Sequence, residues 1–183
     1  TSAKAGVAWA ISPAWRLRAT YGEAFRAPSL ADLYYPGFSN PDLQPEDSQS
    51  YELAVEGGSG GWSTMVALFE NDLDNLIEFD FATFVPQNLG RARARGVEGS
   101  LALRRGLFDG RLVATWLDAE NLDTGSPLLR RPEESASLVV FVRPGSFTVG
   151  GVVRYVGDRT DFGDVALAAY TTVDLSLALR LGE

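Results

Sequence analysis

Three arginines that alternate with alanines constrain the fold of this chain more than any other feature. Arg91, Arg93 and Arg95 are separated by Ala92 and Ala94. Successive side chains of an extended backbone point to opposite faces, so this run places three guanidinium groups on one face and methyl groups on the other. A soluble sheet seldom has this pattern. A transmembrane β-barrel has it readily, because one face meets lipid and the other lines a polar lumen.

The composition excludes several kinds of chemistry. The chain has 183 residues, of which 45% are hydrophobic and 22% charged, and this balance argues against disorder. Its formal net charge of −8 disfavours binding to a nucleic-acid backbone, so we expect no nucleic-acid partner. The sequence contains neither His nor Cys, which removes the commonest catalytic bases, thiol nucleophiles and metal ligands. We therefore expect no catalytic residues, no metal, no cofactor and no enzymatic activity.

Short turn signals alternate along the chain with longer polar connections. The turns lie at 12–13, 57–61, 106–110 and 144–146, and the connections at 27–47, 81–87, 124–132 and 157–168. Tight turns at one rim and large loops at the other are typical of an up-and-down barrel in the outer membrane.

Between these signals we predict about nine antiparallel strands. They cover residues 4–12, 15–25, 48–57, 62–79, 88–105, 111–121, 134–143, 147–157 and 170–181. Several match the ~9–11 residues that a tilted strand needs to cross a bilayer. The predicted fold class is all-β, an antiparallel up-and-down transmembrane β-barrel.

The alternation within the strands assigns their faces. In the last strand Val173, Leu175, Leu177 and Leu179 share one side, which we expect to meet lipid. A soluble β-sandwich with half-buried sheets has the same alternation and stays open as an alternative. The strand that contains the three arginines changes its polar positions from odd to even beyond Gly96. Keeping all of them in the lumen requires a β-bulge near Gly96, or a strand that ends there.

A set of ordered motifs resembles TonB-dependent outer-membrane receptors. The motifs are FRAPS at 25–29, LY at 33–34, NPDLQPE at 40–46, SYE at 50–52 and NLGRARARGVE at 88–98. The segment NLDTGSPLLRRP at 121–132 is most similar to the vitamin B12 (cobalamin) receptors and to their siderophore-receptor relatives. The resemblance covers nearly the whole chain.

The resemblance implies a 22-stranded barrel that encloses a plug domain and takes up a scarce, bulky nutrient, either cobalamin or a ferric siderophore. It places the chain, residues 1–183, in a partial barrel wall in the outer membrane of a Gram-negative-type bacterium, without the plug or the closing strands. The implied partners are outer-membrane lipid, the plug of the same receptor, the TonB complex acting through the plug, and the small-molecule ligand.

Two groups of residues are candidates for function. We expect the first group to face the lumen and to dock the plug, since arginines are costly toward lipid: Arg16, Arg18, Arg91, Arg93, Arg95, Glu98, Arg154 and Asp174. Tyr34, Tyr35 and Phe38 lie in a long outer connection, where they either stack on the ligand or form a small core of the loop itself.

Two other classes of function stay open beside the receptor. A small self-contained outer-membrane barrel, acting as an adhesin or a passive pore, predicts a closed hydrogen-bond ladder within these residues. A soluble β-sandwich binding module predicts that the rows of Leu and Val pack in a core.

Overall fold

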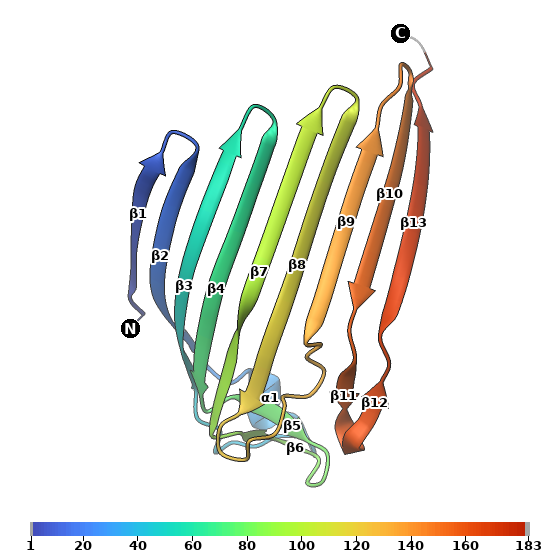
Figure 1. Ribbon diagram of the computed structural model, residues 1–183. Coiled ribbons are helices and arrows are strands. Elements are labelled where there is room, and N and C mark those ends of the chain that lie inside the picture. Colours follow the sequence, from blue (N-terminus) through green and yellow to red (C-terminus); the bar gives the residue numbers. More distant parts are fainter. Residues whose placement is uncertain (1, 182–183) are drawn as a thin grey trace.

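In a computed structural model that describes residues 2–181, one antiparallel sheet dominates the fold (Figure 1). Nine strands of the described residues form this sheet in the order β1-β2-β3-β4-β7-β8-β9-β10-β13. Their bounds are β1 Lys4–Ser12, β2 Trp15–Arg26, β3 Glu46–Ser59, β4 Trp62–Asp74, β7 Arg91–Arg105, β8 Phe108–Asn121, β9 Glu134–Val142, β10 Phe147–Val156 and β13 Tyr170–Leu179. Neighbours in the sheet are consecutive main strands of the chain, as the meander prediction requires.

The remaining elements lie at the rim with the long connections. They are α1 Leu30–Tyr34, β5 Ile77–Asp80, β6 Val85–Asn88, β11 Arg159–Asp161, the short 3-10 helix η1 Phe162–Asp164 and β12 Val165–Leu167. β5 pairs with β6 and β11 with β12, which makes two small hairpins that are separate from the main sheet. The predicted strand at 62–79 is therefore two strands, β4 and β5, with a break at Asn75, whose φ is 57°.

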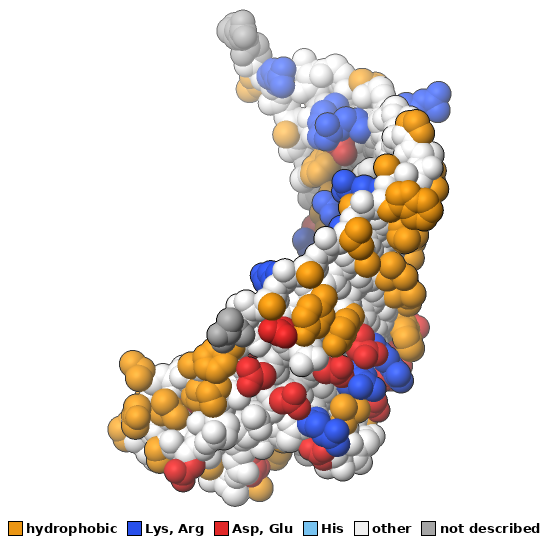
Figure 2. All heavy atoms as spheres, turned by 90° about the vertical axis from the view of Figure 1, so that its left-hand side faces the viewer, with side chains coloured by type: hydrophobic (Ala, Val, Ile, Leu, Met, Phe, Trp, Pro, Cys, Tyr) orange, Lys and Arg blue, Asp and Glu red, His pale blue; other side chains and the backbone are white. Residues whose placement is uncertain are grey.

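The sheet is a single curved layer, and its convex face is apolar. Leu175 and Leu177 are 83% and 71% exposed. Figure 2 shows the hydrophobic side chains gathered along the convex side of the wall. No second sheet covers these rows within residues 2–181, so the sandwich alternative is wrong and the all-β barrel-wall prediction is confirmed.

The wall does not close on itself among the residues described. β1 and β13 stand at the two edges of the sheet, and the closed ladder that the small-barrel alternative predicts is not formed between them in residues 2–181. The same residues contain no helix of the length and hydrophobicity needed to span a bilayer.

Aromatic side chains border the apolar band on both sides. Near the turns, the rings of Trp15 and Trp62 lie 5.8 Å apart, and near the loops those of Tyr21 and Tyr51 lie 5.2 Å apart. Other strands follow the same order, and Phe147 and Tyr155 lie on the convex face at the two ends of the apolar row of β10. At ~3.3 Å per residue and a tilt of ~40°, that interval is about 20 Å high, close to the ~25 Å band of a membrane barrel.

The aromatic border near the loops runs obliquely to the strand pairing. Tyr51 is in register with Glu70, and through it with Arg95 and Asp118. In β8, however, the bordering aromatic is Trp116, two residues nearer the turns than Asp118. Strands that tilt against the membrane have this shift, because a level line crosses each strand at a different register position. Residues that pair with Tyr51 in the later strands therefore lie beyond the apolar band.

Candidate functional site

Four of the predicted charged side chains form ion pairs on the concave face. Arg18 contacts Glu52 (Nη1–Oε1, 2.6 Å) and Glu56 (Nε–Oε1, 2.9 Å) on β3, and Arg16 pairs with the same Glu56. At the other side of the sheet Arg154 on β10 pairs with Asp174 on β13 (Nη1–Oδ2, 2.7 Å). Each pair joins neighbouring strands, so the concave face has charges that are held in place by the sheet.

Glu98 lies on the same concave face and differs from these groups. It is in register with Ala67 on β4 and Thr115 on β8, which bring no opposite charge beside it. Among residues 2–181, no Lys or Arg nitrogen lies within ion-pair distance of its carboxylate. Glu98 is thus a charged group of the concave face that is available to something outside the described residues.

The prediction that Arg91, Arg93 and Arg95 face the lumen is wrong. β7 is continuous from Arg91 to Arg105, and its pairing with β4 and β8 shows no register shift near Gly96, so the predicted bulge is not formed. Without a bulge, the three arginines lie on the same face as Val97, Leu101 and Leu103, which is the convex face.

The three arginines can lie on the convex face because the strands are long and tilted. β4, β7 and β8 continue past the oblique aromatic border, and the convex face there meets water or polar headgroups instead of hydrocarbon, so arginine is tolerated on it. Acidic residues on both neighbouring strands pair with the arginines: Arg93 Nε lies 2.8 Å from Asp72, and Arg95 Nη2 lies 2.9 Å from Asp118. We name this outward group, Glu70, Asp72, Asp74, Arg91, Arg93, Arg95, Asp118 and Glu120, the collar.

The long connection between β2 and β3 is fixed by its own polar residues. Glu46, only 8% exposed, accepts hydrogen bonds from Arg26 Nη1 and from the amide of Ile77, both at 2.8 Å. Asn88 donates to the carbonyl oxygens of Gln44 and Asn75, at 2.9 and 2.7 Å. The NPDLQPE and NLG motifs therefore join the first loop to the root of the β5–β6 hairpin, which is a structural role.

Helix α1 begins with a capping box that presents the candidate aromatic residues. The Ser29 hydroxyl accepts from the Asp32 amide, and the Ser29 amide donates to the Asp32 carboxylate at 2.9 Å. The bond from the Ser29 hydroxyl lowers the pKa of Asp32, with a further contribution from the Ser29 amide. Tyr34 is the last residue of the helix and Tyr35 is its C-cap, so the capped helix fixes the segment that carries the rings.

Tyr34, Tyr35 and Phe38 do not form a core of the loop. They are 67%, 58% and 49% exposed, and the rings of Tyr35 and Phe38 lie 6.2 Å apart. Figure 2 shows hydrophobic side chains at the lower rim that extend to the concave side of the wall. These rings are available for contact with a ligand; whether they bind one stays a prediction.

A second aromatic cluster was not among the predicted site residues. Phe81 lies 4.9 Å from Phe79, ring to ring, and 4.4 Å from Phe162 on η1. The first pair had a local signal, since the segment FDFATF contains three phenylalanines. The contact with Phe162 joins two loops far apart in the sequence, and no local pattern indicates it.

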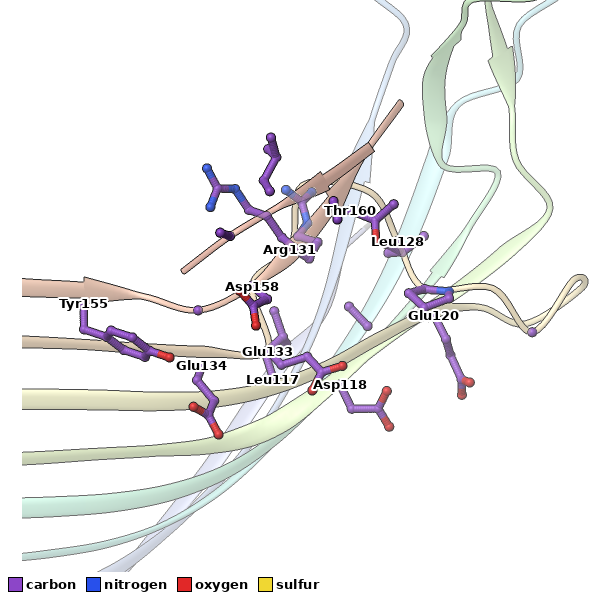
Figure 3. A pocket seen from close by; sticks show the side chains of 18 residues that line it. Leu117, Asp118, Glu120, Leu128, Arg131, Glu133, Glu134, Tyr155, Asp158 and Thr160 are labelled. Carbon is purple, nitrogen blue, oxygen red and sulfur yellow. The ribbon is translucent and has the colours of Figure 1, made fainter. Parts of the chain in front are cut away.

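A cavity of about 920 Å³ lies between the end of the sheet and the β11–β12 hairpin (Figure 3). Seven charged residues contribute to its lining: Asp118, Glu120, Glu133, Glu134, Asp158, Arg131 and Arg159. Two of them, Asp118 and Glu120, belong to the collar, where Asp118 pairs with Arg95. The Arg159 guanidinium lies over the ring of Tyr170, 5.5 Å from its centroid.

The family model "TonB dependent receptor-like, beta-barrel" matches residues 1–182. Among curated proteins, the chain is 30% identical over 169 residues to Vitamin B12 transporter BtuB of Vibrio vulnificus (strain YJ016). That alignment covers 90% of this chain and 28% of the relative, so the chain spans less than a third of the relative's length.

Solved structures share the fold at lower sequence identity. A ferric enterobactin receptor (PfeA) mutant from Pseudomonas aeruginosa superposes with a TM-score of 0.83 at 19% identity, over all of this chain and 33% of that chain. The siderophore receptor PirA from Acinetobacter baumannii gives 0.83 at 16% identity, over all of this chain and 35% of that one. The copper transporter OprC gives 0.80 at 16% identity, over 94% and 30%. At these identities the likeness concerns the fold alone.

Proposed function

This chain belongs to the TonB-dependent receptor family, and we propose that it forms part of the barrel wall of an outer-membrane active transporter for a scarce, bulky nutrient. Cobalamin is the first candidate for the nutrient and a ferric siderophore the second. The observation that carries the choice is the 30% identity to a vitamin B12 transporter over 90% of this chain. The transporter catalyses no reaction; its loops select the ligand.

The proposed location is the outer membrane of a Gram-negative-type bacterium. The convex band of Leu, Val and aromatic residues fits contact with lipid there, and at ~25 cal/mol per Å² the burial of such rows strongly favours the bilayer. The collar lies beyond this band on the loop side, so its charges fit the zone of headgroups and water.

The concave face is the proposed contact surface for the plug of the same receptor, which links transport to the TonB complex. Four predicted residues, Arg16, Arg18, Arg154 and Asp174, are already paired within the wall, and each keeps some donors or acceptors exposed. Glu98 has no such pair among the described residues, so we assign it the most direct contact with a basic group of the plug. The three collar arginines have no part in this contact, since they face outward.

The ligand is proposed to contact the exposed rings of Tyr34, Tyr35 and Phe38 at the loop rim. Flat aromatic rings stack on planar or conjugated ligands, and a corrin and a catecholate both offer such surfaces.

A binding assay on the purified full-length receptor tests the proposal. Cyanocobalamin and a ferric catecholate siderophore are titrated separately, with the quenching of Trp fluorescence as the signal. We expect binding of cyanocobalamin, weakened about threefold to tenfold by Tyr35→Ala, which corresponds to a stacking contact of ~0.5–1.5 kcal/mol. Tyr51→Ala, an aromatic change on the convex face, is the control and leaves affinity unchanged.

Tight binding of the siderophore alone would move the assignment to the second candidate. Binding of neither ligand would refute the proposed substrate class. An equal loss of affinity in the Tyr35 and Tyr51 variants would refute the rim as the contact site.

A further inference from the structure

We propose that the β5–β6 hairpin, residues 77–88, is a strap across the loop-side mouth of the lumen, held closed by the contact of Phe81 with Phe162. We name the contact between Phe81 and Phe162 the clasp. When the clasp opens, a bulky solute can pass from the rim to the concave face. The inference rests on the proposed function, since it assumes that the concave face lines a transport lumen.

The path of the hairpin places it across the mouth. The hairpin leaves the sheet after β4 and returns at β7, yet its tip contacts η1, which lies between β10 and β13 in the chain. In the sheet order, β8 and β9 lie between these two points. Figure 1 draws α1 and the β5–β6 hairpin as more distant than the sheet, and Figure 2 places the loop rim toward the concave side. The hairpin therefore spans a chord of the curved wall instead of following its edge.

Polar contacts fix the root of the strap. The Ile77 amide donates to the buried Glu46, and Asn88 is bonded to the first loop as described above. A further bond joins Asn40 Nδ2 to the Pro86 carbonyl oxygen at 3.1 Å. The strap thus starts from a position that the first loop determines.

The other half of the clasp is anchored as firmly. Arg130 pairs with Asp161 through its Nε at 2.5 Å, and its amide donates to the Thr160 carbonyl oxygen at 2.8 Å. The Arg130 side chain and the Phe162 amide together lower the pKa of Asp161. η1 is therefore tied to the segment after β8, and Phe162 is presented at its start.

The clasp itself is apolar and half solvated. The two rings lie 4.4 Å apart at 36°, and Phe81 and Phe162 are 37% and 46% exposed. Phe84 and Asp164, near the two tips, have φ values of 60° and 58°, a left-handed conformation that is unfavourable for residues other than Gly. The roots of both segments are held by polar contacts, whereas the clasp is a single exposed ring contact between strained tips. We therefore expect the clasp to open before either root does.

Labelling of engineered cysteines tests the strap without any ligand. This 183-residue chain contains no Cys, and any cysteine elsewhere in the full-length receptor is first replaced by serine. In the full-length receptor in the outer membrane, Ala94→Cys places a thiol on the concave face of β7, and Gln49→Cys places one on the convex face of β3. A bulky hydrophilic maleimide is added from outside. We expect Phe81→Ala to speed labelling at 94 at least fivefold and to leave labelling at 49 unchanged. Phe84→Ala, a ring on the same hairpin outside the clasp, leaves both rates unchanged. Equal rates at 94 with and without Phe81 would overturn the inference.

A reversible cross-link gives the second test. In the variant with Phe81→Cys and Phe162→Cys, a short reducible dithiol-reactive linker bridges the two hairpins. We expect cyanocobalamin to associate at least tenfold more slowly with the bridged receptor and to recover its rate after reduction. Failure of the bridge to form, or an unchanged association rate in a fully bridged receptor, would overturn the clasp. If the unmodified receptor binds no cyanocobalamin, the proposed ligand fails, and the labelling rates alone decide on the strap.

Discussion

Replacing Leu112 by arginine tests the assignment of the two faces of the wall. Leu112 lies on the convex face of β8, in register with Leu101 on β7 and Leu138 on β9, in the middle of the apolar band. An arginine facing lipid near the midplane of a barrel costs ~2–4 kcal/mol. At ~1.4 kcal/mol per factor of ten, Leu112→Arg lowers the folding equilibrium constant about 30-fold to 700-fold.

Two arginine substitutions in the same strand serve as controls. Val113→Arg adds the same charge one residue away on the concave face, level with Ser100 and Ser137, where water and polar groups surround it. Glu120→Arg places the charge on the convex face at collar height. We expect each control to change stability by no more than about 1 kcal/mol.

Urea titration of the full-length receptor in lipid vesicles measures the three free energies of unfolding. We expect the free energy of unfolding of the Leu112→Arg variant to lie far below those of the Val113→Arg and Glu120→Arg variants. A larger loss for Val113→Arg would mean that the concave face meets lipid, and an equal loss for Glu120→Arg would mean that the collar lies inside the hydrocarbon.

Two further predictions concern single residues outside the proposed site. A Cβ on Gly57 would lie 2.6 Å from the ring of Trp15, so we expect Gly57→Ala to lower the free energy of unfolding by ~1–3 kcal/mol in the same titration. The control is Gly99→Ala, whose Cβ would have no atom within 4 Å, and it changes this free energy by less than ~0.5 kcal/mol. The pKa of Asp161 is lowered, so its pair with Arg130 stabilises the β11–β12 hairpin at pH values above the ordinary Asp pKa of ~3.9. This contribution is lost as the pH falls through the lower pKa of the folded state. A spin label at Val165→Cys should therefore become more mobile as the pH falls below about 4, and Asp161→Asn should make it mobile already at neutral pH; a label mobility that is the same at all pH values in both proteins would contradict this.

Much of the wall was predictable because its two faces have different solvents. The first strand was predicted at residues 4–12 and lies there, and the row that contains Leu175 and Leu177 faces outward as predicted. In such strands, a period of two and a bounding turn determine both position and face.

The facing of Arg91, Arg93 and Arg95 was not predictable from the alternation alone. A polar residue fits a lumen and fits equally the water above a membrane, and the sequence does not show at which height a tilted strand leaves the lipid. The aromatic border at Tyr51 and Trp116 shows this height, but it can be related to the arginines only through the register of several paired strands.

The loops were the least predictable part. The capping box of α1 has a local signal in Ser29 and Asp32, although a helix of five residues has too few positions for an apolar period. The contact between Phe81 and Phe162 depends on how two hairpins fold over the sheet, and neither hairpin contains information about the other in its own pattern.

The collar gives the same strands two kinds of support along their length. Below the collar, the convex face consists of apolar side chains in contact with lipid, and salt does not weaken this contact. Within the collar, neighbouring strands are joined by carboxylate–guanidinium ion pairs, which dissolved salt weakens. The convex face of the wall therefore responds to ionic strength at its loop-side end, while the apolar rows of that face do not. A change in the external salt concentration therefore alters the stability of the collar and leaves the contact between the apolar rows and the lipid unchanged.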